Sequence, residues 1–461
     1  MVVQHNMQAA NANRMLNITT GAQSKSTEKL SSGYRINRAA DDAAGLSISE
    51  KMRKQIRGLD KASSNAEDGV SSVQTAEGAL TEVHSMLQRM NELAVQAANG
   101  TNSDTDRGAI QDEISQLTTE IDRVAETTKF NETYLLKGGN GTKDVYMNGH
   151  DAGLKGTLTD SATTATFKVA AGALDAGKSV TIGGKDYTIG STLDETKALA
   201  KAAKAATNTS FTVDDTKYNV DAAGKITKDG DATEVTVDDI VKTGSKVSYD
   251  GKTLTAADID AATGVDKSDS SVISAAHAVD LMEKELTAAN NIGATKTAAT
   301  AKKAAAYTSK DGVTFDIKKG TAEVADKLSF SLHVGSDADM TNKITVDIET
   351  MNSSYLGIKG LNVNDDSGIA GTYAIDAISD ALQKVSEQRS SLGAVQNRLE
   401  HTIDNLDNVV ENTTTAESRI RDTDMAEEMV NYSKNNILAQ AGQSMLAQAN
   451  QSNQGVLSLL Q

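Results

Sequence analysis

The two ends of this chain follow a helical repeat, whereas its middle follows a strand repeat. Both ends carry apolar residues at spacings of three and four, the pattern of long paired helices. From about 140 to 355, apolar residues alternate with polar ones between turns rich in threonine, glycine and aspartate. All 12 arginines lie outside this middle, at or before Arg123 or at or after Arg389. Two arms that pair around a separate insert indicate a subunit built for assembly rather than an enzyme.

The clearest helical repeat runs from Ile375 to Ile420, and only Arg389 and Gln396 interrupt it. Spacing sustained over about five heptads predicts a coiled-coil seam. Residues 48–94 and 110–124 keep the same spacing, so we expect an antiparallel bundle whose apolar face is core rather than a cofactor site. The positions expected to form this outer-core seam are Val73, Leu80, Leu87, Leu382, Leu399 and Leu406.

The extreme ends, 1–33 and 424–461, are rich in alanine, glutamine, asparagine and serine and carry only thin apolar stripes. Isolated helices of this quality are marginal in water, because little apolar burial offsets the entropy of ordering them. We therefore expect these ends to become ordered only when other copies of the chain cover them. The residues expected to form this inner-core assembly surface are Val3, Met7, Leu16, Ile437, Met445, Val456 and Leu459.

The middle predicts a small α+β core. Glycine and aspartate turns between alternating residues predict hairpins at 179–189, 247–254 and 307–315. Short helices fit at 192–206 and 271–289. The predicted fold class is mainly α, with long terminal helices pairing the two ends and a central strand-rich insert.

Composition excludes several classes of function. The net charge of −17 argues against nucleic acid as a main partner, because phosphate binding needs a basic footprint. No apolar stretch is long enough to predict a membrane span, and the N-terminus lacks the pattern of a secretory signal. The chain has no cysteine, and its six histidines fall in no ligand spacing. We therefore predict no enzyme activity, no cofactor and no metal site; the asparagine- and aspartate-rich segment 362–368 is interpreted as a turn.

Proline is also absent from all 461 residues. Proline costs roughly 3 kcal/mol inside a helix, which explains its absence from the ends. That reason does not reach the loops of the middle. Avoiding slow cis/trans isomerisation is a second explanation, relevant if the chain must travel unfolded and refold quickly.

Both ends resemble bacterial flagellin. The N-terminal likeness lies in Asn11-Ala12-Asn13-Arg14, in Glu28-Lys29-Leu30-Ser31-Ser32-Gly33-Tyr34-Arg35-Ile36-Asn37, and in Ala39-Ala40-Asp41-Asp42-Ala43-Ala44-Gly45-Leu46. The C-terminal likeness runs from Ser391-Leu392-Gly393-Ala394-Val395-Gln396-Asn397-Arg398-Leu399 to the closing Val456-Leu457-Ser458-Leu459-Leu460. The resemblance covers about 1–140 and 328–461, and the middle resembles no family that we can name.

The resemblance implies a secreted structural subunit of the bacterial flagellar filament, exported unfolded by the flagellar type III system. It implies these partners: other copies of the chain, an export chaperone, the filament cap and the hook-filament junction proteins. It also implies these five segments: an inner-core helix and spoke (1–44), outer-core helices (45–139), a variable exposed insert (140–327), return strands with an outer-core helix (328–420), and an inner-core helix (421–461).

The resemblance further implies recognition by the host Toll-like receptor that senses flagellin. The implied contact residues are Gln88, Arg89, Glu92, Leu93, Gln96 and Glu113. Arg89, Leu93 and Gln96 are spaced to share one helical face, with Arg89 pointing outward beside an exposed leucine. The same face could instead pack subunit against subunit. Asn91 replaces the family's usual second arginine, which bears on affinity.

Three other functions stay open at this point. A hook-filament junction protein is a related alternative, although its ends usually match the flagellin pattern less completely. A cytoplasmic coiled-coil scaffold is an alternative that a secretion assay would separate. An enzyme carried in the insert is disfavoured by the missing metal motif.

Overall fold

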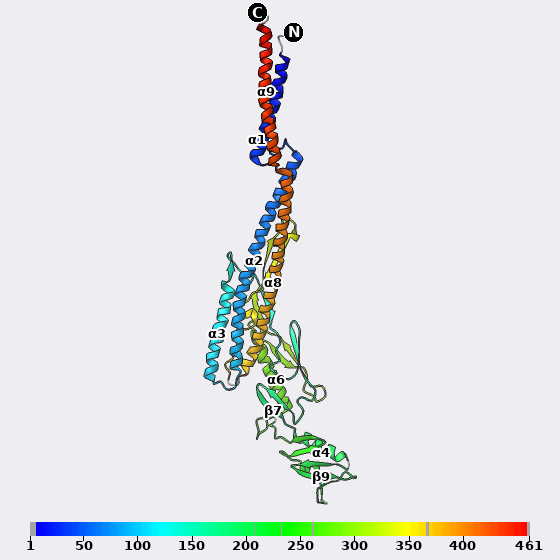
Figure 1. The fold of residues 1–461 in the computed structure, drawn as a ribbon. Helices are drawn as coiled ribbons and strands as arrows, with labels where there is room; N and C mark the ends of the chain where they lie inside the picture. Colours follow the sequence, from blue (N-terminus) through cyan, green and yellow to red (C-terminus); the bar gives the residue numbers. More distant parts are fainter. Residues whose placement is uncertain (1–5, 207, 232, 261, 366–367, 459–461) are drawn as a thin grey trace. The chain divides into compact units, whose positions relative to one another are not determined.

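The computed structural model describes residues 6–206, 208–231, 233–260, 262–365 and 368–458 (Figure 1). Two compact units divide the chain. The first comprises 1–71, 331–345 and 395–461, and the second comprises 72–330 and 346–394. Long helices pair near both termini and the centre is rich in strands, which confirms the predicted fold class.

The helices run over these residues: α1 Met7–Ser32, α2 Ala43–Ala97, α3 Asp104–Thr127, α4 Leu193–Ala205, α5 Val237–Ile240, α6 Ala275–Asn290, η1 (a 3-10 turn) Met340–Asn342, α7 Ser353–Leu356, α8 Ile369–Arg421 and α9 Met425–Ser458. The strands run over these residues: β1 Lys129–Phe130, β2 Thr133–Tyr134, β3 Thr142–Tyr146, β4 Thr157–Asp160, β5 Thr164–Val169, β6 Ser179–Ile182, β7 Lys185–Ile189, β8 Ser210–Val213, β9 Thr216–Val220, β10 Ile226–Lys228, β11 Glu234–Val235, β12 Lys246–Tyr249, β13 Lys252–Thr255, β14 Val272–Ile273, β15 Thr300–Lys303, β16 Val313–Lys318, β17 Thr321–Ala325, β18 Leu328–His333 and β19 Lys343–Ile348.

In the first unit, α1 and α9 lie side by side (Figure 1). Asn6 caps α1 through its side-chain oxygen, which accepts a hydrogen bond from the Ala9 amide at 2.9 Å. Its side-chain nitrogen donates to the Ala449 carbonyl of α9 at 3.2 Å. Gly33 ends α1 at a φ of +77°, a conformation that glycine adopts without strain, and its N–H donates to the Lys29 carbonyl.

The chain segments that follow α1 and α8 lie side by side and are joined by hydrogen bonds. The Arg35 amide donates to the Arg421 carbonyl at 2.6 Å, and the Thr423 amide donates to the Gly33 carbonyl at 3.0 Å. The ring of Tyr34 lies beneath the guanidinium of Arg421, 4.8 Å from the ring centroid. These backbone and cation–π contacts hold the C-terminal end of α1 next to the C-terminal end of α8.

Within the first unit, α2 and α8 pack antiparallel. Leu59 of α2 clusters with Leu406 of α8, and Ala66 clusters with Leu399. Because rising numbers on α2 meet falling numbers on α8, the predicted heptads form one continuous seam here. Gly69 leaves room beside this seam for β18, since a Cβ at Gly69 would collide with the Leu332 side chain.

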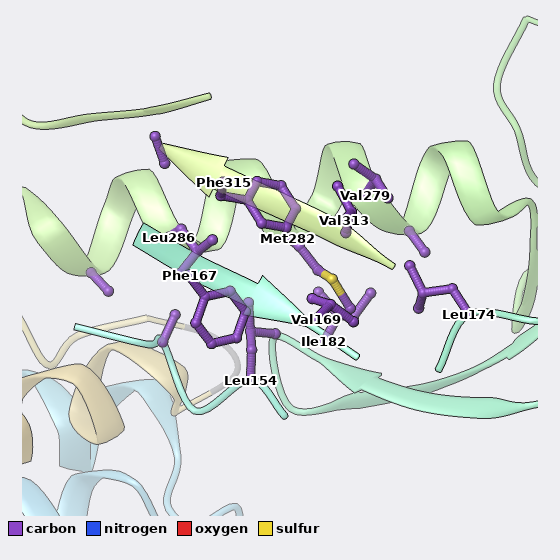
Figure 2. Close-up of a cluster of buried hydrophobic side chains, with 14 of the residues drawn as sticks. Leu154, Phe167, Val169, Leu174, Ile182, Val279, Met282, Leu286, Val313 and Phe315 are labelled. Atoms are coloured by element: carbon purple, nitrogen blue, oxygen red, sulfur yellow. The ribbon is translucent and has the colours of Figure 1, made fainter. Parts of the chain in front are cut away.

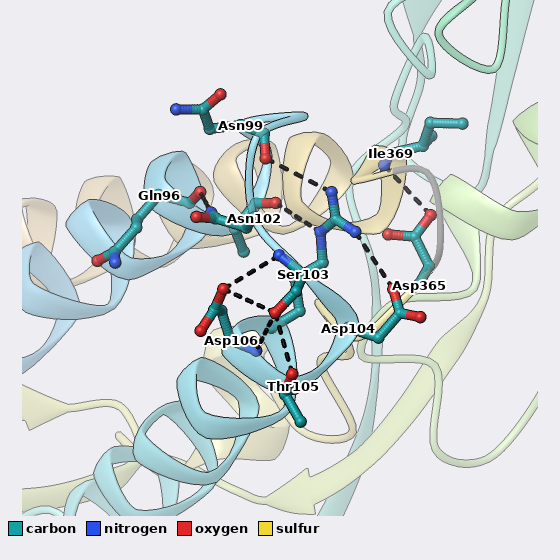
Figure 3. A network of polar contacts seen from close by, with 11 residues as sticks. Gln96, Asn99, Asn102, Ser103, Asp104, Thr105, Asp106, Asp365 and Ile369 are labelled. Carbon is teal, nitrogen blue, oxygen red and sulfur yellow. Dashed lines mark hydrogen bonds and ion pairs between the residues drawn. The ribbon is translucent and has the colours of Figure 1, made fainter.

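In the second unit, a polar network holds the turn between α2 and α3 (Figure 3). Ser103 and Asp106 form a capping box at the start of α3. The guanidinium of Arg107, only 3% exposed, donates to the Ala97 carbonyl at 3.1 Å and to the Asn99 carbonyl at 3.4 Å. It thereby places a positive charge beside the C-terminus of α2, where the last carbonyl groups of a helix lack partners within the helix.

The two larger hydrophobic cores in the described part of the insert are separate from each other. In the first, Phe167 of β5 and Phe315 of β16 face the side of α6 that carries Met282 and Leu286 (Figure 2). The sheet under this helix has the order β15-β16-β5-β4, with Phe315 paired directly with Phe167. Alternating buried and exposed residues along β5 explain why only one face of the sheet is apolar.

The second core belongs to residues 191–256, a segment that we call the inner module. Its six-stranded sheet has the order β11-β10-β9-β8-β12-β13, covered by α4. Phe211 stacks on Tyr218 at a centroid distance of 5.8 Å. Ser191 forms a parallel bridge with Ala256, so the chain enters and leaves this module at one place.

Most of the predicted insert elements are confirmed. The hairpins at 179–189 and 247–254 correspond to β6-β7 and β12-β13, and the predicted helices correspond to α4 and α6. The hairpin predicted at 307–315 is confirmed in its turn but not in its first strand. Thr308 and Gly312 form an antiparallel bridge across the turn, whereas the strand that pairs with β16 is β15, which ends earlier, at Lys303.

Candidate assembly and recognition surfaces

The paired terminal helices expose most of their large apolar side chains. Ile437 is 67% exposed, Met445 is 61% exposed and Met7 is 73% exposed. Large exposed patches of this kind mark sites of protein–protein contact. Further exposed members, which the sequence interpretation did not single out, are Met15, Ile18, Met425, Met429, Val430 and Leu438.

An open cavity of about 710 Å³ lies between α1 and α9. Leu16 is half-buried in its wall, where Gly442 allows the two helices to approach: a Cβ on Gly442 would lie 3.3 Å from the Leu16 side chain. The pair therefore buries little of its own apolar surface. Of the other predicted assembly residues, Val3 and Leu459 lie outside the described residues, and the side chain of Val456 is not described either.

The structure places the predicted seam residues at different depths. Val73, Leu80, Leu87 and Leu399 are fully buried, and Leu406 is 8% exposed. Leu382 is only half-buried. The fully buried residues nearest to it on α8 are Ala381 and Val385, so the apolar stripe there is displaced by one residue from the strict heptad.

The residues that resemble a receptor contact come from two neighbouring helices. Arg89 of α2 donates to Glu113 of α3 at 2.9 Å and to Glu92 of its own helix at 3.2 Å. The hydrogen bond to Glu113 is the largest influence that raises the pKa of Arg89 above its ordinary value. Gln88 approaches His84 at 3.1 Å, and the side chain of Gln96 is exposed. These polar groups therefore lie on one accessible surface.

The prediction of an exposed leucine beside Arg89 is wrong. Leu93 is only 2% exposed, whereas Val95 is 53% exposed. Leu93 lies three residues after the fully buried Met90 and therefore shares its helical face, which is core in this unit. The accessible surface is polar, with Arg89 at its centre.

The described part of the chain shows neither a membrane-spanning helix nor a metal-binding cluster. No helix there is long and apolar enough to cross a membrane. In the same residues, no group of three or more histidine, cysteine, aspartate or glutamate side chains could hold a metal ion.

Both ends of the chain match family models. The bacterial flagellin N-terminal helical region matches residues 3–141, and the bacterial flagellin C-terminal helical region matches residues 375–460. The likeness to known proteins extends through the middle. The chain is 40% identical over 457 residues to a flagellin of Clostridium tyrobutyricum, a match that covers 98% of this chain and 100% of that protein.

The chain belongs to the bacterial flagellin family. It is also 36% identical over 462 residues to a flagellin of Bacillus subtilis strain 168, with both chains covered in full. Flagellin B of Vibrio anguillarum is 35% identical over 460 residues, which cover 99% of each chain. This flagellin is therefore a secreted structural subunit of the extracellular flagellar filament and not an enzyme.

Proposed function

We propose that this flagellin polymerises through the exposed apolar faces of α1 and α9, after export as an unfolded chain through the flagellar type III system. The observation that carries the proposal is the exposure of Met7, Ile437 and Met445 on helices that are otherwise paired. Other copies of the chain would cover these side chains in the filament wall. The absence of proline and cysteine supports transport of an unfolded chain that must refold quickly.

The partners of this proposal follow from the same surface. Exposed apolar helices would associate prematurely in the cytoplasm, so an export chaperone would cover them before transport. A filament cap would fold the arriving chain, and hook-filament junction proteins would receive the first subunits. The polymer of identical chains is the partner that the exposed faces of α1 and α9 support most directly.

The test is removal of residues 424–461. The truncated protein should remain a folded, soluble monomer and should form no filaments, as judged by sedimentation and electron microscopy. A point variant separates assembly from folding: Ile437→Asp should reduce polymerisation more than it lowers the melting temperature of the monomer. Normal filaments from the truncated chain would refute the proposal.

We also propose that the surface around Arg89 binds the host Toll-like receptor that senses flagellin. Its support is the resemblance of 88–96 and Glu113 to the family's contact segment, together with the exposed Arg89–Glu113 pair. An arginine is a frequent hot spot in protein interfaces. The burial of Leu93 limits its role to shaping the helix beneath this surface.

The receptor proposal is tested on the depolymerised monomer. Arg89→Ala should weaken binding to the receptor ectodomain by about ten-fold or more, the effect of losing an interface hot spot. Arg123→Ala is the matched control, because Arg123 is also an exposed arginine paired with a glutamate on its own helix. Equal affinity of wild type and Arg89→Ala would exclude the proposed site.

A further inference from the structure

Two rows of like charge run along the outside of the helix pair in the first unit. The basic row lies on α2, at positions three or four residues apart, and consists of Lys51, Lys54, Arg57 and Lys61. The acidic row lies on α8 at the same kind of spacing and consists of Glu400, Asp404, Asp407 and Glu411. Each spacing places its four side chains along one side of a helix, and all eight residues are exposed.

The two rows lie on different sides of the helix pair. Asp407 accepts a hydrogen bond from Ser63 at 3.1 Å, so the acidic row borders the seam on the side where Ser63 lies. At 3.6 residues per turn, Lys54 lies about 180° and Lys61 about 160° around α2 from Ser63. The basic row therefore points away from the acidic row of its own chain.

The basic row forms no ion pair within the described part of its own chain. Among the described residues, none of its four side chains forms an ion pair, although Arg53 beside them pairs with Glu417 at 3.7 Å. The carboxylates nearest in sequence are Glu50, which pairs with Arg421 at 2.9 Å, and the exposed Asp60. A row of four unpaired cations on one face is a strong attractive surface for a matching row of carboxylates.

The acidic row matches the basic row in charge and in length. Within the described residues its members form no ion pair: Glu400 accepts a hydrogen bond from Gln396 at 2.8 Å, and Asp407 accepts the one from Ser63. At about 1.5 Å per residue, the basic row spans about 15 Å and the acidic row spans about 16 Å. Two parallel rows of four opposite charges could therefore face each other along their whole length.

We infer that the basic row of one subunit docks against the acidic row of the next. This inference rests on the proposed assembly of the chain and names a second surface that directs it. Because the two rows occupy different faces, each subunit keeps one row free after its first contact. Such a head-to-tail contact does not pair two subunits off as a dimer, and it produces an open helical polymer where the rotation between subunits does not close a ring.

Charge reversal tests the inference. The variants are a basic reversal (Lys54→Glu with Lys61→Glu), an acidic reversal (Asp404→Lys with Glu411→Lys) and the four changes combined in one chain. Light scattering measures the elongation of wild-type filament seeds by wild-type monomer and by the monomer of each single reversal. The combined chain is added to seeds made from the combined chain itself. Each single reversal should slow elongation by about ten-fold or more, because like charges then face each other. The combined chain should recover a rate near that of wild type.

A control variant and a folding measurement complete the experiment. Lys302→Glu with Lys310→Glu makes the same change in net charge as the basic reversal, on exposed residues of the insert, and should leave elongation unchanged. If a reversal unfolds the monomer, as judged by circular dichroism, Lys54→Gln with Lys61→Gln replaces it and should show a weaker dependence of elongation on salt than wild type. The inference is overturned if single reversals elongate like wild type, or if the combined chain is no faster than either. Failure of wild type itself to elongate would instead count against the proposed assembly.

Discussion

Arg107 shows how one buried charge can hold the end of a long helix. Its guanidinium donates to the Ala97 carbonyl at the end of α2 and to the Asn99 carbonyl in the following turn, and it lies 3.7 Å from the Asp104 carboxylate. The approach of α8 to the same place depends on Gly371, since a Cβ there would lie 2.8 Å from the Ala98 amide nitrogen. The turn between α2 and α3 is therefore closely packed as well as polar.

We predict that Arg107→Ala destabilises the second unit by about 2–4 kcal/mol, because it removes the side-chain donor from the buried Ala97 carbonyl and opens a cavity. Urea unfolding of the monomer, followed by circular dichroism, measures the loss. Arg123→Ala on the same helix should have little effect, since the Arg123–Glu120 pair is exposed. If both variants lose the same free energy of unfolding, the buried network does not stabilise the protein more than the exposed ion pair does.

Asp376 on α8 provides a prediction about pH. Burial is the main cause that raises its pKa, while the nearby charge of His150 acts in the opposite direction. The folded protein therefore holds this proton more tightly than the unfolded chain does. The contribution of Asp376 to stability is fully present below the ordinary aspartate pKa of about 3.9 and is lost as pH rises through the raised folded-state value.

We expect Asp376→Asn to be more stable than wild type at neutral pH and to show a flatter loss of stability as pH rises from about 4. Thermal unfolding of the monomer at a series of pH values measures both effects. The exposed Asp112→Asn is the control, and its stability should follow that of wild type. A variant with the wild-type slope would show that Asp376 does not carry this dependence.

Some residues could be assigned from the sequence and others could not. Heptad spacing was enough to find Leu80, Leu87 and Leu399, because a seam between two helices repeats regularly. Leu93 was misassigned because spacing gives the face of a helix but not how many neighbours cover that face. The contact of Tyr34 with Arg421 joins residues far apart in the sequence, so no local sequence pattern predicts it.

At the scale of elements, the inner module is the part best suited to fold alone. The side chain of Ser191 donates to the Thr255 carbonyl at 2.7 Å, which ties together its two ends. Its core includes Phe211 and Val247 and is separate from the core under α6. A segment with adjacent ends and its own core has the features of an independent domain.

We predict that residues 191–256, expressed alone, give a cooperative thermal transition and a well-dispersed amide NMR spectrum. Phe211→Ala is the control for specific packing and should abolish the transition, since truncating a buried phenylalanine costs about 3–5 kcal/mol. An unstructured wild-type fragment would show that the module depends on the rest of the insert.

Elements also show where sequence patterns stop being informative. The turn signals at 183–184 and 250–251 are sufficient because hairpin partners are adjacent in the chain. β16 also pairs with β5, which precedes the inner module in the sequence, and that non-local pair depends on packing against α6. Local turn chemistry therefore predicted hairpins well and non-local pairs poorly.

At the scale of the whole molecule, one strand pair closes the insert. β3 pairs antiparallel with β17, so Thr142 lies opposite Ala325. We propose that 140–327 is a separate, exposed domain whose two ends meet at this pair. A short linker could then replace it at small entropic cost, since loop closure depends weakly on length.

We predict that replacing 140–327 with a short glycine-serine linker leaves secretion and polymerisation intact. Electron microscopy of the culture supernatant should show filaments that lack the insert. The terminal truncation described above serves as the negative control. A shortened chain that is secreted but never polymerises would show that the insert belongs to the filament wall.

The pairing of the two ends has a consequence for the order of folding. Asn6 bonds to a residue 443 positions away, and Ser49 bonds to one 368 positions away. The hairpins of the insert, by contrast, join near neighbours. Contacts of such long sequence separation form late, because the whole intervening chain must first be available. In the export that we propose, the helices of the end that emerges first would lack their partner until the last residues arrive, whereas the insert could fold before then.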